Sequence, residues 1–340
     1  MCGIAGLFSE RVPPDEGRLI EMCDMLVHRG PDDEGVYTSG PVGLAHRRLS
    51  IIDVESGHQP MFNEDETVSV IFNGEIYNHQ SLREDLSSGG HTFTSRTDTE
   101  VIVHLYEEHG LQFVQHIDGM FAFALWDETA ERLILARDRM GIKPLLVAEG
   151  GETIAFSSEL PALLASGVDH GGLDTDAFAH YFGTGFIPSP QTAFENISKL
   201  CPGELAVVSK DGIRRQSFYT PSVSAHDQGI ETAASTVREN VEHAIERRLQ
   251  SDVPLGAFLS GGIDSSIVVA VLSNLLDEQV KTFTVGFEAE RFDAALADVG
   301  DSELIRMTQS FRSPIDAVAA LTVRSQRGDA VIVDDVVVGR

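Results

Sequence analysis

The residue best placed to do chemistry is the second in the chain. Cys2 follows the initiator methionine and precedes a glycine, in the segment MCGIAG. A small residue at this position allows removal of Met1, which would give Cys2 a free α-amine with a pKa of about 8. A thiol and a base on one residue form a compact nucleophile. The alternative is a surface cysteine that happens to follow the start of the chain.

A second chemical signal is the segment SGGIDSS at residues 260–266, which follows an apolar run and precedes a helical pattern. Backbone N–H groups of a glycine turn and serine hydroxyls at a helix N-terminus can bind phosphate groups. No Gly-Lys-Ser/Thr follows, so the segment is not a Walker A loop. The alternative is a structural glycine–serine turn.

Six short motifs follow one another in the first half of the chain. They are MCGIAG (1–6), HRGPDD (28–33), RLSIID (48–53), NGEIYN (73–78), SRTDTE (95–100) and RDRMGIKP (137–144). Together they resemble the class II glutamine amidotransferases, from Cys2 to about Tyr219. The resemblance implies an α+β fold with four αββα layers, that of the N-terminal-nucleophile hydrolases. It also leads us to read HRGPD as a scaffold loop beside Cys2 without a catalytic role.

The resemblance implies roles for the motif residues. Cys2 would be the nucleophile, and the Asn73 side-chain amide with the Gly74 backbone N–H would form the oxyanion hole. Losing one such donor typically costs about 10²–10³ in rate. Taken alone, Asn73-Gly74 is also a good hairpin turn. The predicted catalytic residues are Cys2, Asn73 and Gly74.

The same resemblance implies a pocket for the two charges of free glutamine. Arg48 would bind the α-carboxylate through a bidentate pair, whereas Glu75 and Asp98 would lie beside the α-ammonium. Taken alone, Arg48 could be an ordinary surface arginine. The predicted glutamine-binding residues are Arg48, Leu49, Ser50, Ile51, Ile52, Asn73, Gly74, Glu75 and Asp98.

The SGGIDSS segment resembles the pyrophosphate loop of ATP pyrophosphatases. A class II glutaminase followed by this loop resembles the glutamine-hydrolysing asparagine synthetases. That resemblance implies ATP as a substrate, Mg²⁺, and aspartate as the acceptor, activated as β-aspartyl-AMP and attacked by ammonia. It places Leu259 and Val285 at the adenine. The predicted ATP-binding residues are Leu259, Ser260, Gly261, Gly262, Asp264, Ser265, Ser266 and Val285.

The resemblance fades near Arg291. Residues 291–340 contain six arginines and no lysine, and the family's second nucleotide loop, SGEGxDE-like, is not found. We expect an out-of-frame or recombined tail, with a divergent terminus as the alternative. Two other functions stay open: a free-standing glutaminase with an inert synthetase domain, and a non-catalytic glutamine-binding fragment. Glutamine-dependent ammonia release separates the enzymes from the binding fragment.

Elements that could position these residues follow from apolar patterns. We predict strands at 3–8, 42–48, 68–73, 122–127, 132–137 and 154–157, and helices at 16–27, 80–86, 98–109 and 158–166. A polar stretch at 221–229 suggests a linker. After it, a predicted strand–helix–strand unit implies a parallel sheet. The expected organisation is an amidotransferase domain at 2–218, a linker at 219–235, a partial α/β ATP-pyrophosphatase domain at 236–290 and a tail of unknown structure at 291–340.

The composition limits the classes of function. The net charge is −28 over 340 residues, and only four of the 25 basic residues are lysines. Nucleic-acid binding depends on neutralising phosphates, so we expect no nucleic acid as partner. Adaptation to a salt-rich cytoplasm explains the acidity, with a merely acidic enzyme as the alternative. Three cysteines fit neither a disulfide framework nor a zinc site, and we expect no metal ligands, no membrane segment and a cytoplasmic location. The oligomeric state is left open.

Overall fold

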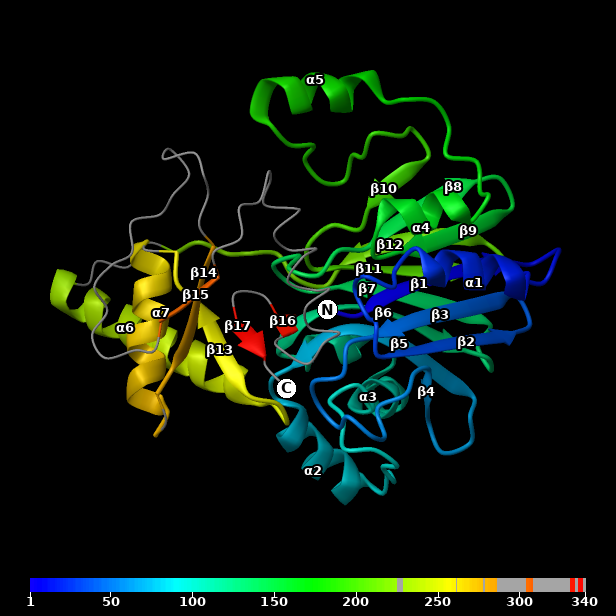
Figure 1. The fold of residues 1–340 in the computed structure, drawn as a ribbon. Coiled ribbons are helices and arrows are strands. Elements are labelled where there is room, and N and C mark those ends of the chain that lie inside the picture. The colour runs from blue at the N-terminus through cyan, green and yellow to red at the C-terminus, as the bar shows by residue number, and fades with distance from the viewer. Residues whose placement is uncertain are drawn as a thin grey trace. The chain divides into compact units, whose positions relative to one another are not determined.

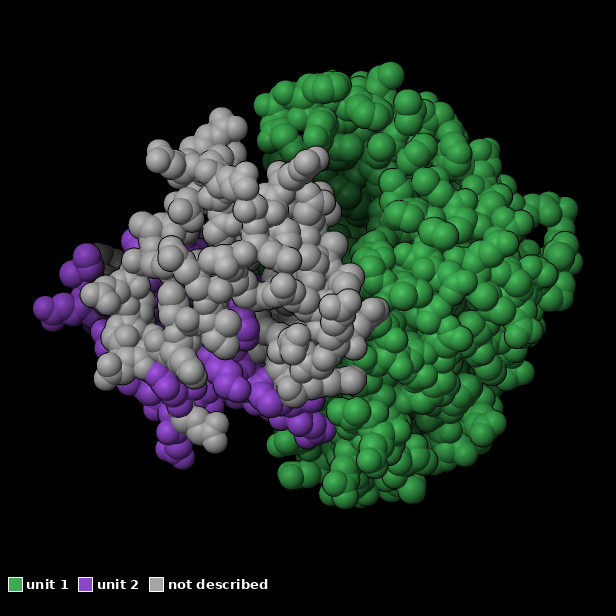
Figure 2. All heavy atoms as spheres, in the orientation of Figure 1, with its two compact units in different colours: residues 1–222 green, residues 223–340 purple. Residues whose placement is uncertain are grey.

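The structure, a computed structural model, describes residues 1–224, 229–260, 262–277 and 279–285, and the backbone of three short strands at 304–307, 331–333 and 336–338. The chain divides into two compact units, residues 1–222 and 223–340 (Figure 2). None of the described helices is long and apolar enough to span a bilayer.

Unit 1 contains two six-stranded sheets (Figure 1). The first has the order β10 (Ile197–Lys199), β8 (Leu146–Gly150), β9 (Thr153–Ser157), β1 (Gly3–Ser9), β3 (Val42–Arg48), β2 (Asp33–Ser39). The second has the order β12 (Gly212–Ser217), β11 (Glu204–Ser209), β7 (Arg132–Arg137), β6 (Gly119–Asp127), β5 (Val68–Ile76), β4 (Met61–Phe62). All the neighbouring strands whose register is described run antiparallel.

Three apolar cores hold these sheets in four layers. The middle core joins Ile4 of β1 to Ile71 of β5 and so lies between the sheets. The outer face of the first sheet is covered by α1 (Glu16–Asp24) and α4 (Leu160–Ala165), and that of the second by α2 (His79–Gly89) and α3 (Val101–His109). The order helix, sheet, sheet, helix confirms the predicted αββα fold. The short η1 (Gly110–Gln115) and α5 (Thr175–Thr184) complete the helices described in this unit.

Unit 2 contains the predicted strand–helix–strand. After α6 (Ile230–Glu246) and η2 (Arg247–Leu249) come β13 (Leu255–Phe258), α7 (Ile263–Leu275) and β14 (Lys281–Val285). β13 and β14 pair in parallel, as expected for a crossover through a helix. The sheet is completed by β15 (Leu304–Met307), β16 (Val331–Val333) and β17 (Val336–Val338), in the order β15-β14-β13-β17-β16. β17 runs antiparallel to β13, so the sheet is mixed.

The helix predicted at residues 98–109 is wrong at its N-terminal end, which carries the predicted site residue Asp98. The helix expected from Asp98 begins at Val101, so Asp98 does not lie in its first turn. The Asp98 carboxylate instead accepts a hydrogen bond of 2.8 Å from the N–H of Ile76. The Glu100 carboxylate accepts backbone hydrogen bonds before the helix, from Thr94 at 2.6 Å and from Ser95 at 2.7 Å. Backbone donors outside the helix therefore bind both carboxylates.

Candidate active site

Cys2 lies where β1 begins, opposite the end of β3. The register pairs Gly3 with Arg47, so Cys2 stands opposite Arg48. Side chains alternate along a strand and Ile4 points into the core between the sheets. The Cys2 and Arg48 side chains therefore point to the inner side of the first sheet.

Two neighbours fix the position of Cys2. The N–H of Leu49 donates to the Cys2 Sγ at 3.4 Å. The Cys2 carbonyl accepts a hydrogen bond of 2.9 Å from Nε of Arg29, a buried side chain that also pairs with Glu159 at 2.7 Å. A Cβ at Gly30 would lie 2.4 Å from a backbone oxygen of β3, so only glycine fits there. The HRGPD loop therefore lies beside Cys2, as predicted.

Asn73 lies on β5, in the second sheet. Ile71 of the same strand points into the core between the sheets, so alternation turns Asn73 to that side too, toward the sheet of Cys2. Asn73 is 1% exposed, and its Nδ2 has no hydrogen-bond partner among the described residues. A buried donor without an acceptor costs about 1–3 kcal/mol. An acceptor from outside the chain would remove that cost.

The N–H of Gly74 is presented at an edge of the second sheet. Along β5 the N–H groups of Phe72 and Ile76 point away from β6 and donate to side chains, those of Gln59 at 2.7 Å and Asp98 at 2.8 Å. Alternation points the Gly74 N–H to the same edge, between these two. β4 pairs with β5 only near its start, so no described strand covers the edge at Gly74.

The other side of Gly74 is closely packed. It stands opposite Phe121 of β6, and a Cβ at Gly74 would lie 2.2 Å from the carbonyl oxygen of Met120. On the side away from Gly74, the backbone of Phe121 makes two hydrogen bonds with Asp138. The Phe121 N–H donates to the Asp138 carboxylate at 3.2 Å, and the Phe121 carbonyl accepts from the Asp138 N–H at 2.8 Å. Asp138 thus gives the RDRMGIKP motif a positioning role behind the site.

Two polar residues that the sequence analysis missed join the sheets just before Asn73. The His46 ring on β3 lies with Nε2 3.1 Å from the carbonyl oxygen of Phe72 on β5. Burial lowers the pKa of His46 to about 3, so the ring is neutral and donates this bond. Gln59, also buried, binds the N–H of Phe72. The one available signal was a polar residue inside an apolar alternation.

The Arg48 guanidinium is buried and donates to backbone carbonyls of the segment that follows. The acceptors are the carbonyl oxygens of Ile52 at 3.1 Å, Asp53 at 2.6 Å and Val54 at 3.1 Å. Earlier in this segment Leu49 and Ser50 are buried, and Ile51 and Ile52 are half-buried. Arg48 therefore shapes the segment that carries four of the predicted glutamine-binding residues.

The two predicted acidic ligands lie near Gly74. Glu75 follows it directly and, by alternation, points to the same side of the sheet as Asn73. Asp98 reaches the N–H of Ile76. Burial raises the pKa of Asp98, against the lowering effect of that hydrogen bond and of nearby His79. A cation beside Asp98 would favour the charged carboxylate.

In unit 2 the predicted phosphate loop lies between β13 and α7. Gly261 falls outside the described residues, and Gly262 is the N-cap residue of α7. The Ser265 hydroxyl lies 3.1 Å from the Ser260 hydroxyl, and Ser266 Oγ donates to the carbonyl of Gly262 at 2.7 Å. Leu259 is buried, and Asp264 is exposed in the first helical turn. Val285 ends β14, where only its backbone is described.

The loop offers few ligands for Mg²⁺. Asp264 is the carboxylate that the motif provides, and the described residues hold no group of three or more metal-ligating side chains there. The loop residues alone do not form a magnesium site.

Comparison with known proteins identifies unit 1. Residues 1–219 match the family described as "Glutamine amidotransferase domain". The chain belongs to the glutamine amidotransferase family. Residues 236–299 of this amidotransferase match a second family, described as "Asparagine synthase", so that similarity extends slightly past the point where the sequence resemblance fades.

Curated relatives of the amidotransferase agree with both matches. It is 38% identical over 86% of its length to asparagine synthetase (glutamine-hydrolysing) 1 of Bacillus subtilis, and covers 47% of that protein. It is 36% identical over 85% of its length to a putative asparagine synthetase (glutamine-hydrolysing) 2 of Methanocaldococcus jannaschii, and covers 60% of it. The chain thus spans about half the length of the curated relatives it matches.

Solved structures share the fold. The allosteric regulatory enzyme of purine biosynthesis has a TM-score of 0.50 and 16% identity, with 84% of this chain and 75% of that chain covered. At this identity the similarity supports the fold alone.

Proposed function

We propose that this amidotransferase hydrolyses glutamine with Cys2 and supplies the ammonia to an ATP-dependent site that activates aspartate. The observation that carries the glutaminase half is the buried Asn73 amide without an acceptor. It lies beside the Gly74 N–H and on the side of β5 that faces the sheet of Cys2. Two donors facing a nucleophile suit the oxyanion of acyl transfer.

In the proposed reaction the Cys2 Sγ attacks the amide carbon of glutamine. The α-amine freed by loss of Met1 takes the thiol proton, and the carbonyl oxygen becomes an oxyanion bound by Asn73 and Gly74. Collapse of this intermediate breaks the C–N bond, and the α-ammonium returns the proton to the leaving ammonia. Water then attacks the thioester by the same route, which releases glutamate and restores the thiol.

The charges of the pocket support free glutamine as the substrate. Arg48 is the cation on the Cys2 side, and a carboxylate would add to its backbone acceptors. Glu75 and Asp98 are the anions on the Asn73 side. Asp98 is buried, so an α-ammonium would offset the cost of keeping it charged.

Two features support the second half of the proposal. Residues 236–299 match the asparagine synthase family, and the SGGIDSS loop lies between β13 and α7. There, backbone N–H groups at the start of α7 and the hydroxyls of Ser260 and Ser265 would bind the phosphates of ATP. We assign Leu259 and Val285 to the adenine. The loop does not form a magnesium site by itself, so no step is assigned to Mg²⁺.

Glutamine hydrolysis by the purified full chain tests the proposal. We expect glutamate and ammonia in equal amounts, abolished by Cys2→Ala or by a form that keeps Met1. Cys201→Ala, a matched removal of a thiol outside the site, should keep the activity. Full activity of the Met1-retaining form would overturn the α-amine as base. Aspartate-dependent release of pyrophosphate from ATP tests the second half, and pyrophosphate release without aspartate would argue against that acceptor.

A further inference from the structure

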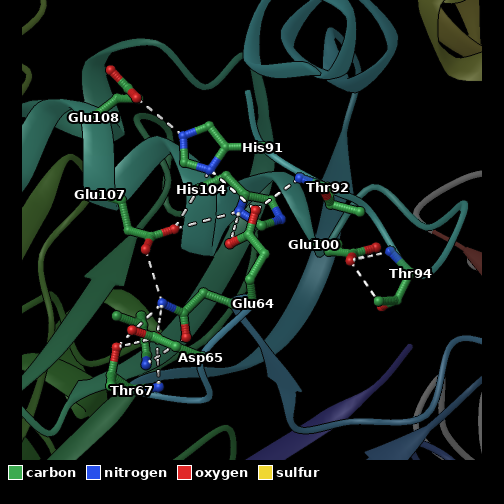
Figure 3. A network of polar contacts seen from close by, with 12 residues as sticks. Glu64, Asp65, Thr67, His91, Thr92, Thr94, Glu100, His104, Glu107 and Glu108 are labelled. Carbon is green, nitrogen blue, oxygen red and sulfur yellow. Dashed lines mark hydrogen bonds and ion pairs between the residues drawn. The ribbon is translucent and has the colours of Figure 1, made fainter. Parts of the chain in front are cut away.

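Two histidines and two glutamates from separate parts of unit 1 meet beside α3 (Figure 3). Glu64 lies in the turn between β4 and β5, His91 follows α2, and His104 and Glu107 belong to α3. One ligand atom from each side chain lies within 4.8 Å of the others. None of the four belongs to the proposed glutaminase site.

The spacing of these atoms fits a shared ion. Nδ1 of His104 lies 3.4 Å from Oε2 of Glu64 and 3.4 Å from Oε2 of Glu107. Nδ1 of His91 lies 3.7 Å from Oε2 of Glu107 and 3.5 Å from Oε1, the other carboxylate oxygen, of Glu64. A tetrahedral zinc site with bonds of about 2.0–2.2 Å separates its ligand atoms by roughly 3.3–3.6 Å. Ordinary hydrogen bonds would be shorter, at about 2.7–3.2 Å.

His104 gives independent evidence for a ligand. Its side chain is 1% exposed, and neither ring nitrogen has a hydrogen-bond partner among the described residues. A buried imidazole whose nitrogens have no hydrogen-bond partner offers a lone pair to a metal ion.

The surrounding residues orient three of the four side chains. Hydrogen bonds from outside the cluster are Thr92 N–H to Glu64 Oε1 at 2.7 Å, Asn63 Nδ2 to Glu107 Oε1 at 2.8 Å, and His91 Nε2 with Glu108 Oε1 at 3.1 Å. Each leaves an atom of the ligand free to face the cluster. Metal-bound histidines and carboxylates characteristically have such outer partners.

We propose that Glu64, His91, His104 and Glu107 bind one Zn²⁺ ion in a structural four-coordinate site. Imidazole nitrogens with carboxylate oxygens suit zinc, whereas Mg²⁺ and Ca²⁺ prefer oxygen ligands alone. Glu64 also lines a cavity of about 280 Å³. The ion ties the β4–β5 turn to α3 and holds the intervening segment that carries Asp98.

Zinc binding by the full chain tests this site. The Cys2→Ala variant is used, so that the Cys2 thiol does not bind metal, and the protein is stripped with a chelator. Titration with Zn²⁺ against a colorimetric chelator should give one ion per chain and a raised melting temperature. Co²⁺ in its place should give the visible absorption of a tetrahedral complex.

Variants identify the ligands. His91→Gln should weaken zinc binding by at least about a hundredfold, and Glu108→Gln, which keeps all four ligands, by about 10- to 100-fold. His109→Gln is the matched control. His109 is the last residue of α3, and its ring stacks on His116 outside the cluster. Absence of stoichiometric binding, or binding unchanged in both His91→Gln and Glu108→Gln, would overturn the proposal.

Discussion

Asn73 directly precedes Gly74 on β5, and Asp98 binds the N–H of Ile76, two residues after Gly74. The proposed reaction uses these two side chains at different stages. Asn73 offers a donor to an oxygen that becomes charged only during attack. Asp98 offers charge to a group of glutamine that does not change. Their variants should therefore affect different kinetic constants.

Asn73→Ala should lower kcat for glutamine by about 10²–10³ with little change in KM. Asp98→Asn should mainly raise KM, because it removes a charge that binds substrate and intermediate alike. Steady-state kinetics on glutamine measures both. Asn78→Ala is the control, because it removes a side-chain amide just outside β5. Equal effects on kcat from Asn73→Ala and Asp98→Asn would contradict the roles assigned to these two residues.

His46 makes the stability of unit 1 depend on pH. Its pKa is about 3 in the folded state, below the usual 6.5, so the unfolded chain binds the extra proton first as the pH falls. Stability from this residue is therefore full above pH 6.5 and is lost toward pH 3. Between pH 7 and pH 5 the loss is about 2 kcal/mol.

Urea unfolding at the two pH values measures this loss. In His46→Gln the amide can still donate to Phe72, and no proton is taken up. The variant should thus lose about 2 kcal/mol less than the wild type over the same interval. If the free energy of unfolding changed equally with pH in the two proteins, His46 would take up its proton in the folded state as readily as in the unfolded chain.

Motifs at the residue scale could be found because their chemistry is local. Cys2, Asn73 and Gly74 each stand in a short segment whose order along the chain can be read directly. His46 and Gln59 could not be found in this way, because their partner is the backbone of Phe72 on a strand distant in sequence from His46. The four proposed zinc ligands are likewise spread over 64–107 without a recognisable spacing.

At the scale of elements, some strands with strong apolar patterns were predicted and others, such as β11, were missed. The strands at 42–48 and 132–137 were predicted with the bounds observed for β3 and β7. β2 was missed because its buried and exposed positions alternate irregularly. The helix start at Val101 was missed because the acidic residues before it resemble a capped first turn, whereas backbone N–H groups outside the helix bind both carboxylates.

Close contact between the scaffold loop and β3 gives a prediction at this scale. Gly30→Ala would place a Cβ 2.4 Å from the carbonyl oxygen of Arg47. Because that neighbour is backbone, the loop must move, and we expect a loss of about 1–3 kcal/mol in the free energy of unfolding. Urea denaturation measures it.

Gly89→Ala is the matched control for Gly30→Ala. Gly89 is the last residue of α2, and nothing lies within 4 Å of an added Cβ. Alanine there should be neutral or stabilise by about 0.4–1 kcal/mol. Equal stability of Gly30→Ala and the wild type would mean that the loop does not press against β3.

For the whole molecule, the net charge of −28 dominates. Like charges repel over about 30 Å at 0.01 M salt, but over only about 3 Å at 1 M. We expect the melting temperature of the chain to rise by several degrees as KCl is raised from about 0.02 to 0.5 M, where screening is nearly complete.

A thermal series in KCl measures this rise. A steep rise that levels off above about 0.5 M indicates screening, whereas a slow rise that continues to high salt indicates stronger burial of apolar surface. Sucrose at matched osmolarity is the control that leaves charges unscreened. A melting temperature independent of salt over the low range would contradict the expectation that repulsion among the carboxylates destabilises the chain.

The edge of β5 has a further consequence, for association between molecules. An open strand edge invites another strand to add to the sheet, and proteins commonly block such edges. Here Gln59 and Asp98 bind the donors on either side of Gly74, so an added strand would lose the bonding partners it needs along the row. What remains is a gap one donor wide, which admits a single carbonyl oxygen. The contacts that frame the proposed oxyanion hole therefore also protect the sheet against aggregation.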